Sequence, residues 1–324
     1  MILDLVILAV GFFILVKGAD IFVDGSSALA KLFRVPGLII GLTIVALGTS
    51  APELAVSTAA ALSGSNEIAI SNVLGSNMFN LLMVLGICAL FFPIPSGKEI
   101  VKRDFPISML VTALLFVLSG LWRVFGGDIT SIKMSDNVGL VSRADGIILL
   151  VLFVIYIAYL IYDAKKHPEE ETKEELKPLW KCVTLIIVGL LMVIGGGQAV
   201  VYSAKEIAAA LGMTETLIGL TVVAVGTSLP ELVTSIVAAR KHETGLAVGN
   251  VVGSNIFNLM FILGVSTSIN PVAVNFASFW DILILEFVSL VTFIFLITGK
   301  RINRTEGVVM ILFYVAQVIF AIMR

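Results

Sequence analysis

An acidic residue lies inside an apolar stretch that is long enough to cross a bilayer. Residues 41–61 read GLTIVALGTSAPELAVSTAAA, with Glu53 near the middle. A carboxylate at the centre of a membrane helix costs about 2.5 kcal/mol or more, so it is a functional candidate by default. Pro52 has no backbone N–H and suits the first turn of a helix, which predicts a break near Gly48 and a restart around Pro52. The sequence therefore predicts a broken membrane helix that carries an acid.

The same arrangement occurs a second time further along the chain. Residues 219–239 read GLTVVAVGTSLPELVTSIVAA, with Glu231 in the place of Glu53, 178 positions later (231 minus 53). The offset continues without a gap through a second polar stretch, SNVLGSNMFNLLMVLG at 71–86 and GNVVGSNIFNLMFILG at 249–264. About half of the aligned residues are identical. Two copies in register indicate an internal repeat.

The composition is that of a polytopic membrane protein. Hydrophobic residues make up 58% of the 324 positions and charged residues 14%, with a mean hydropathy of +1.07. Soluble domains carry roughly 25% charged residues. The net charge of −2 and the lack of a basic stretch give no indication of a nucleic-acid partner. Cys88 and Cys182 lie in or beside apolar segments, which favours small buried hydrophobic residues over a redox pair or a metal site.

Ten apolar segments predict an all-α membrane protein with ten transmembrane helices. They run over about 2–30, 36–62, 67–92, 105–123, 144–163, 179–209, 214–239, 245–268, 277–298 and 303–323. A charged connection at 164–178 separates an N-terminal half (1–163) from a C-terminal half (179–324), with five helices in each. Each half contains one repeat and one broken helix, which is the second helix in the N-terminal half and the seventh in the C-terminal half.

Positive charge predicts the orientation of the chain, because cytoplasmic loops carry an excess of Lys and Arg. If the 164–178 linker is cytoplasmic, the other side keeps only Arg123, Lys133, Arg143, Lys205 and Arg324. Both termini are then extracytoplasmic. The two repeats start five crossings apart, an odd number, so they insert with opposite polarity. Inverted repeats are the architecture of alternating-access transporters, with the site at the midplane.

The polar residues of the repeats offer many oxygen atoms and two negative charges. Glu53 and Glu231 together neutralise one divalent ion. Hydroxyl, amide and backbone carbonyl oxygens are available from Thr49, Thr227, Ser50, Ser228, Ser76, Ser254, Asn80, Asn258, Ala46 and Ala224. The two carbonyls are expected to lack an i+4 amide partner if each helix ends there. An oxygen set without His or Cys fits Ca²⁺ or Na⁺ rather than Zn²⁺ or copper. The alternative for any single Ser or Asn is a plain hydrogen bond to a neighbouring helix.

Four motifs resemble the paired alpha repeats of the cation/Ca²⁺ exchanger superfamily, specifically the prokaryotic sodium/calcium exchangers. They are GTSAPE (48–53), GSNMFN (75–80), GTSLPE (226–231) and GSNIFN (253–258). The resemblance covers the whole ten-helix plan. It implies a transporter rather than an enzyme, with electrogenic exchange of about three Na⁺ for one Ca²⁺ by two gating helices, segments 1 and 6, that slide past an eight-helix core.

The resemblance also implies a role for each matching position. Glu53 and Glu231 are shared ligands of Ca²⁺ and Na⁺, and Thr49 and Thr227 offer carbonyl oxygens to Ca²⁺. The flanking Na⁺ sites are lined by Ser50, Ser76, Ser228 and Ser254 with the carbonyls of Ala46 and Ala224, and Asn80 and Asn258 face the central site. The implied partners are Ca²⁺, Na⁺ and the lipid bilayer of a prokaryotic inner membrane, with no cofactor and a functional monomer.

One position departs from part of this superfamily. K⁺-dependent members carry an Asp where this chain has Asn258, so K⁺-independent exchange is expected. Proton-coupled calcium exchangers share the GTS-PE core, and Ca²⁺/H⁺ antiport stays open as the alternative. An ion channel is disfavoured because channels are usually symmetric about the membrane normal. A membrane enzyme is disfavoured because no HExxH motif or Ser/His pair occurs.

Overall fold

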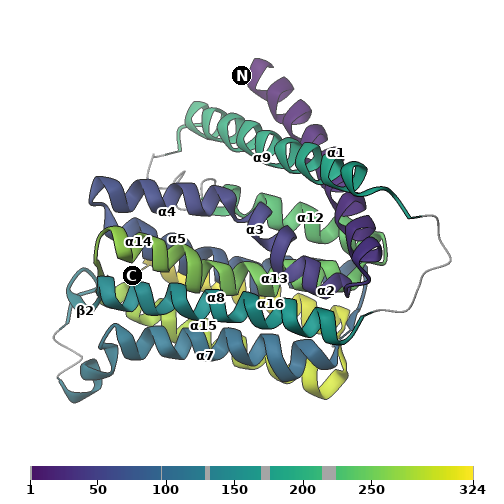
Figure 1. Ribbon diagram of the computed structural model, residues 1–324. Coiled ribbons are helices and arrows are strands. Elements are labelled where there is room, and N and C mark those ends of the chain that lie inside the picture. The colour runs from purple at the N-terminus through teal and green to yellow at the C-terminus, as the bar shows by residue number, and fades with distance from the viewer. Residues whose placement is uncertain (1, 96, 128–131, 169–175, 214–223, 324) are drawn as a thin grey trace. The chain divides into compact units, whose positions relative to one another are not determined.

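The chain divides into two compact units, each of which combines two segments that are distant in the sequence. The computed structural model describes residues 2–95, 97–127, 132–168, 176–213 and 224–323 (Figure 1). Unit 1 is formed by Met1–Pro52 and Tyr159–Ser254, and unit 2 by Glu53–Ala158 and Asn255–Arg324. Each unit therefore holds part of the first repeat and part of the second.

The described residues of unit 1 form helices and the connections between them, with no β-strand. Its elements are α1 (Ile2–Phe33), α2 (Gly37–Ile40), the π-helical turn η1 (Gly41–Val45), α3 (Ala46–Thr49), the end of α8 (Arg143–Lys166), α9 (Leu179–Ala210), α11 (Ala224–Thr227), α12 (Leu229–Arg240) and most of α13 (Thr244–Ile256). Residues 214–223, which open the predicted seventh segment, lie outside the described residues.

Unit 2 contains further helices and two short antiparallel ribbons. The helical elements are α4 (Ala51–Ser63), α5 (Asn66–Met78), η2 (Phe79–Val84), α6 (Leu85–Phe91), η3 (Ile100–Asp104), α7 (Phe105–Leu118), η4 (Leu121–Gly126), most of α8, η7 (Phe257–Ile262), α14 (Leu263–Ile269), α15 (Phe276–Gly299) and α16 (Arg304–Met323). Strand β1 (Ile94–Pro95) pairs with β4 (Arg301–Ile302), and β2 (Asn137–Val141) pairs with β3 (Val272–Asn275). The ribbons join connections between helices and satisfy backbone groups there.

The helices match the apolar segments expected from the sequence. Each of the ten segments contains helix, and seven helices of the described residues are individually long and apolar enough to cross a membrane. One further pair, Gly37–Thr49 and Ala51–Ser63, is bent by 50° at its break. The number of ten crossings stays a prediction.

Both expected helix breaks are present. The first lies at Ser50, between α3 and α4, with Pro52 in the first turn of α4. The second lies at Ser228, between α11 and α12, with Pro230 in the first turn of α12. A proline in the first turn loses no intrahelical hydrogen bond, so the new helix starts there without cost. Both breaks place the following Glu in a helical first turn.

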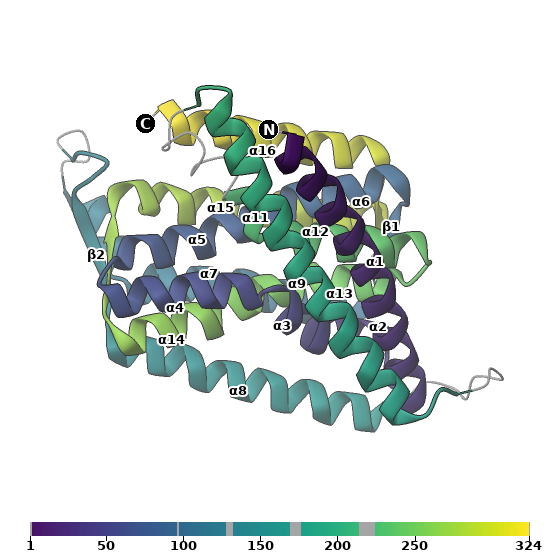
Figure 2. The same ribbon diagram turned by 90° about the horizontal axis from the view of Figure 1, so that it is seen from above.

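The two longest helices of unit 1, α1 and α9, lie side by side (Figure 1, Figure 2). Glycines at their crossing permit close backbone approach. A Cβ atom at Gly196 would lie 2.5 Å from the backbone N of Leu15, and one at Gly18 would lie 2.6 Å from the Cβ of Met192. Larger residues at these positions would therefore force the helices apart.

We expect Gly196→Ala to lower the thermal unfolding midpoint by several degrees, because overpacking a tight contact costs about 1–3 kcal/mol. Gly195→Ala, one position along the same helix, is the matched control, since a Cβ there meets no described atom within 4 Å. Thermal unfolding of the purified protein in detergent measures both. Equal midpoints for the two variants would show that the α1–α9 contact is not close-packed.

Candidate cation site

In unit 1, the second repeat's acid is held by a residue of the first repeat. Glu231 lies in the first turn of α12 and its side chain is fully buried. Ser50 Oγ donates a hydrogen bond to Glu231 Oε1 at 2.8 Å. The other carboxylate oxygen, Oε2, is buried and accepts no hydrogen bond from any described residue. One oxygen of Glu231 is thus oriented by Ser50 while the other stays available to a ligand.

The start of α12 is fixed by Asn250 of α13. Its Nδ2 donates to the carbonyl oxygen of Glu231 at 3.3 Å and to Ser235 Oγ at 2.9 Å, and its Oδ1 accepts from Thr49 Oγ1 at 2.9 Å. Ser254, one turn further along α13, is fully buried, and its hydroxyl makes no hydrogen bond to the described residues. Thr49, Ser50, Glu231 and Asn250 therefore form one buried hydrogen-bonded cluster in unit 1.

In unit 2, the first repeat's acid has the same kind of surroundings. Glu53 lies fully buried in the first turn of α4, and Ser76 Oγ donates to its Oε1 at 3.4 Å. Asn72 Nδ2 donates to the carbonyl oxygen of Glu53 at 3.2 Å and to Ser57 Oγ at 2.9 Å. These bonds repeat those of Asn250 in unit 1 at the 178-residue offset. The asparagine therefore holds the start of the acid-bearing helix in the same way in both repeats, whereas the serine that binds the acid differs.

Two asparagines of unit 2 have side-chain carbonyl oxygens that accept no hydrogen bond within the described part of the chain. Asn80 and Asn258 lie in the π-helical turns η2 and η7 and are fully buried. Asn258 Nδ2 donates to Ser76 Oγ at 3.2 Å, so the second repeat also contacts the neighbour of Glu53. The Oδ1 atoms of Asn80 and Asn258 accept no hydrogen bond from the described residues. Buried acceptor oxygens without a donor fit a cation that supplies the missing positive charge.

One expectation about the helix breaks is wrong. The carbonyl of Ala46 was expected to lack an i+4 amide partner, but Ser50 N donates to it at 3.0 Å. The reason is that α3 continues to Thr49, so the chain leaves the helix later than expected. The hydroxyl of Thr49 also lies 3.4 Å from this carbonyl oxygen. Ala224, its counterpart, opens α11 directly after residues that the structure does not describe.

The remaining expected residues lie at the second break. Thr227 ends α11 and is half-buried, and Ser228 is the buried residue between α11 and α12.

Glu53 belongs to unit 2 and Glu231 to unit 1. The expectation that the two carboxylates lie in one pocket therefore stays a prediction. Within the described ranges, no group of three or more His, Cys, Asp or Glu side chains gathers. The donors are oxygen atoms, as Ca²⁺ and Na⁺ prefer.

Some residues that shape the site were not expected from the sequence. Ser57 and Ser235 bind the positioning amides Asn72 and Asn250, and Asn77 and Asn255 contact the candidate ligands Asn258 and Asn80. The sequence does contain one indication of their importance: Ser57 recurs as Ser235, and Asn77 as Asn255, at the same 178-residue offset.

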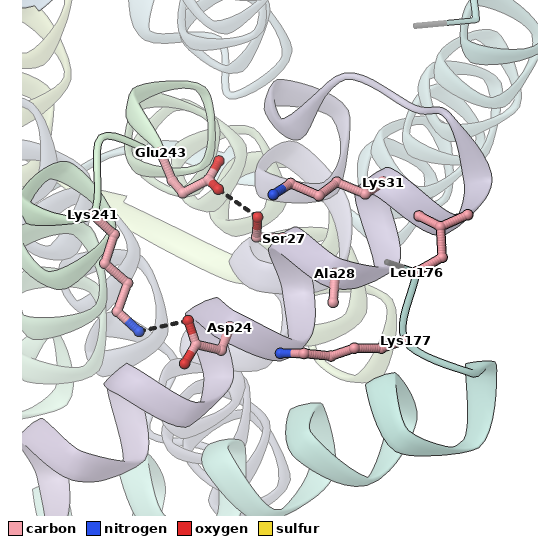
Figure 3. A pocket seen from close by; sticks show the side chains of 8 residues that line it. All are labelled: Asp24, Ser27, Ala28, Lys31, Leu176, Lys177, Lys241 and Glu243. Atoms are coloured by element: carbon pink, nitrogen blue, oxygen red, sulfur yellow. Dashed lines mark hydrogen bonds and ion pairs between the residues drawn. The ribbon is translucent and has the colours of Figure 1, made fainter. Parts of the chain in front are cut away.

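A separate polar pocket in unit 1 ties α1 to the connection between α12 and α13 (Figure 3). It has a volume of about 260 Å³. Lys241 Nζ lies 2.7 Å from Asp20 Oδ1 and 2.6 Å from Asp24 Oδ1, and Ser27 donates to Glu243. Partial burial lowers the pKa of Lys241, but the hydrogen bonds to Asp20 and Asp24 outweigh it, so the pKa is raised overall. Lys241 therefore stays charged at neutral pH.

Comparisons with known proteins show which family the chain resembles. A family profile described as "Sodium/calcium exchanger protein" matches residues 3–162 and 181–323. The putative antiporter CaxA of Alkalimonas amylolytica is 36% identical, and the match covers 97% of each chain. The sodium/calcium exchanger MaX1 of Methanosarcina acetivorans is 34% identical, again over 97% of each chain.

A solved structure matches over nearly the whole length. The sodium-calcium exchanger NCX_Mj, in crystals soaked with 10 mM Na⁺ and no Ca²⁺, superimposes with a TM-score of 0.82 at 30% identity and 98% coverage of both chains. The match extends through both repeats and all the helices between them. With its apolar helices and buried oxygen clusters, this chain is a multi-pass membrane protein and a transporter rather than an enzyme. It belongs to the sodium/calcium exchanger family.

Proposed function

We propose that the chain is an electrogenic Na⁺/Ca²⁺ antiporter with ten transmembrane helices arranged as two inverted repeats. Glu53 and Glu231 are the shared ligands of both ions in one alternating-access site. The observation that supports this most is the exchange of contacts between repeats: Ser50 of the first repeat binds Glu231 of the second, and Asn258 of the second binds Ser76, which contacts Glu53. A site built from both repeats can respond to a movement of either.

The charge of the site accounts for the electrogenic exchange. Two carboxylates are neutralised by one Ca²⁺, whereas about three Na⁺ leave the site with one positive charge. Ca²⁺ and Na⁺ are nearly equal in size, so the same oxygens serve either ion. The hydroxyls of Ser50, Ser76, Ser228 and Ser254, with the carbonyls of Ala46 and Ala224, supply the flanking Na⁺ positions. Thr49 and Thr227 offer carbonyl oxygens to Ca²⁺.

Ca²⁺/H⁺ antiport is the alternative to Na⁺/Ca²⁺ antiport for a protein of this superfamily. Asn258 supplies a neutral amide rather than a third acid, which supports independence from K⁺. The many Ser and Asn residues around the two acids support Na⁺ coupling. Radioactive Ca²⁺ uptake into proteoliposomes tests this directly. An outward Na⁺ gradient should drive uptake without added K⁺, and a pH gradient alone should not. Uptake driven by the pH gradient alone would assign Ca²⁺/H⁺ antiport instead, and uptake without any counter-gradient would assign a channel.

The orientation of the protein follows from its basic residues. We propose a location in the prokaryotic inner membrane, with the 164–178 linker in the cytoplasm and both termini outside, because this arrangement places most Lys and Arg residues in cytoplasmic loops. In this proposal the protein functions as a monomer in the lipid bilayer and transports Ca²⁺ and Na⁺.

Lys241→Met is expected to change the rate of exchange more than the stability of the protein. Partly exposed ion pairs contribute about 0–1 kcal/mol, so the unfolding midpoint should move little. If α1 moves during transport, freeing it from Lys241 should alter the maximal rate about two- to fivefold without changing the half-saturating Ca²⁺ concentration. Lys165→Met, at the exposed end of α8, is the control. An unchanged maximal rate would show that this contact does not limit the movement.

A further inference from the structure

Two buried asparagines outside the expected ligand set join the repeats in unit 2. Asn77 on α5 and Asn255 on α13 are 0% and 2% exposed. Asn77 Nδ2 donates to the backbone carbonyl of Asn255 at 3.2 Å, and Asn255 Nδ2 donates to the backbone carbonyl of Asn77 at 3.3 Å. We call this reciprocal pair the amide clasp. It satisfies two carbonyls and two amide nitrogens in the interior, where each would be costly to leave unpaired.

The side-chain oxygens of the amide clasp bind the two candidate ligand amides. Asn258 Nδ2 donates to Asn77 Oδ1 at 3.0 Å, and Asn80 Nδ2 donates to Asn255 Oδ1 at 3.3 Å. Each ligand amide is thus held by the clasp residue of the opposite repeat. Packing the two helices together requires only the bonds to the backbone carbonyls. The bonds from Asn258 and Asn80 are not needed for this packing, so they indicate a further role for Asn77 and Asn255.

This further role is to determine which end of the side-chain amides of Asn80 and Asn258 faces a cation. An amide carries two N–H donors on one side and a carbonyl acceptor on the other, and a half-turn about its last bond exchanges them. Asn258 uses its nitrogen for both Asn77 and Ser76. Its Oδ1, like that of Asn80, is buried and receives no hydrogen bond from the described residues. Holding the nitrogen therefore leaves the oxygen as the free end.

We propose that Asn77 and Asn255 are positioning residues that orient the amides of Asn258 and Asn80 so that oxygen, and not N–H, faces the transported cation. The proposal rests on the proposed function, because it takes Asn80 and Asn258 as ligands. Without the clasp, the Asn80 amide loses its hydrogen bond to Asn255 and the Asn258 amide is held by Ser76 alone. A ligand amide then turns more easily, and its reversed orientation presents partial positive charge to Ca²⁺. The clasp therefore acts on ion affinity through Asn258 and Asn80.

A double-mutant cycle separates this role from packing. Asn77→Leu should raise the half-saturating Ca²⁺ concentration for Na⁺-driven uptake about tenfold, because it removes the acceptor that holds the Asn258 amide. In an Asn258→Ala background there is no amide to orient, so Asn77→Leu should then change the value less than about twofold. Asn270→Leu is the matched control, since Asn270 donates a 3.5 Å hydrogen bond to Ala61 O elsewhere in unit 2. It should leave the half-saturating concentration at the parental value.

The symmetry of the clasp provides a second, independent cycle. Asn255→Leu in the parental and Asn80→Ala backgrounds should behave in the same way, and it keeps the test available if Asn77→Leu does not fold. Equal effects in both backgrounds, or a lower unfolding midpoint with unchanged half-saturation, would overturn the positioning role. If Asn258→Ala and Asn80→Ala themselves leave half-saturation unchanged, the ligand assignment in the proposed function fails first, and the clasp loses its role with it.

Discussion

Glu231→Gln and Glu53→Gln, made separately, are each expected to reduce Ca²⁺ uptake about a hundredfold or more. Removing one partner from a buried charge interaction costs about 3–5 kcal/mol. A glutamine keeps the shape of the side chain and its bond to Ser50 or Ser76, but it leaves a divalent ion with half of its compensating charge. Uptake of radioactive Ca²⁺ into proteoliposomes under an outward Na⁺ gradient measures the loss.

Glu67→Gln is the matched control for these variants. Glu67 lies on α5, in the first repeat, and its side chain is exposed. Removing its charge should leave uptake near the parental rate. Full activity in either the Glu231 or the Glu53 variant would contradict the assignment of that acid as a ligand, provided that the protein is equally abundant in the vesicles.

Asn258→Asp is the second large change, and its effect should depend on pH. An ionised Asp has no donor for Asn77 Oδ1, so that bond is lost, and towards Ser76 it can act only as an acceptor. It also adds a third negative charge close to Glu53. We expect Ca²⁺ uptake to fall about tenfold at about pH 8. It should recover in part at about pH 6, because two acids close together disfavour double ionisation and a protonated Asp can again donate one bond.

Asn303→Asp serves as the control for the added charge. Asn303 precedes α16, where its side chain accepts from Glu306 N, and an Asp can take the same role. Its pH profile should match that of the parent. If Asn258→Asp also keeps the parental profile and gains no dependence on K⁺, residue 258 does not face the transported ions.

The helix breaks and the acids could be predicted because their signals are local. A Pro-Glu pair inside an apolar run marks both a restart of the helix and a costly buried charge, and Pro52 and Pro230 lie where this reasoning placed them. The error at Ala46 is also local. Periodicity cannot tell whether a helix ends one residue earlier or later, and that residue decides which carbonyl is paired.

Contacts between distant segments could not be predicted in the same way. Strand β1 has two residues and pairs Ile94 with Ile302, which leaves no periodic pattern to recognise. The sequence shows that Ser50 and Glu231 are polar and repeated, but not that Ser50 binds the acid of the other repeat. The amide clasp is a similar case, because Asn77 resembles any buried helix-packing asparagine until its partners are known.

The central claim is that the two acids form one site that Ca²⁺ and Na⁺ occupy in turn. Isothermal titration of Ca²⁺ into the purified protein tests it most directly, with the parent, Glu53→Gln and Glu231→Gln compared in the presence and absence of Na⁺. We predict one Ca²⁺ per chain in the parent, displacement of that ion by Na⁺, and loss of binding in either variant. Two Ca²⁺ ions per chain, of which each variant loses only one, would show two separate sites and contradict the account.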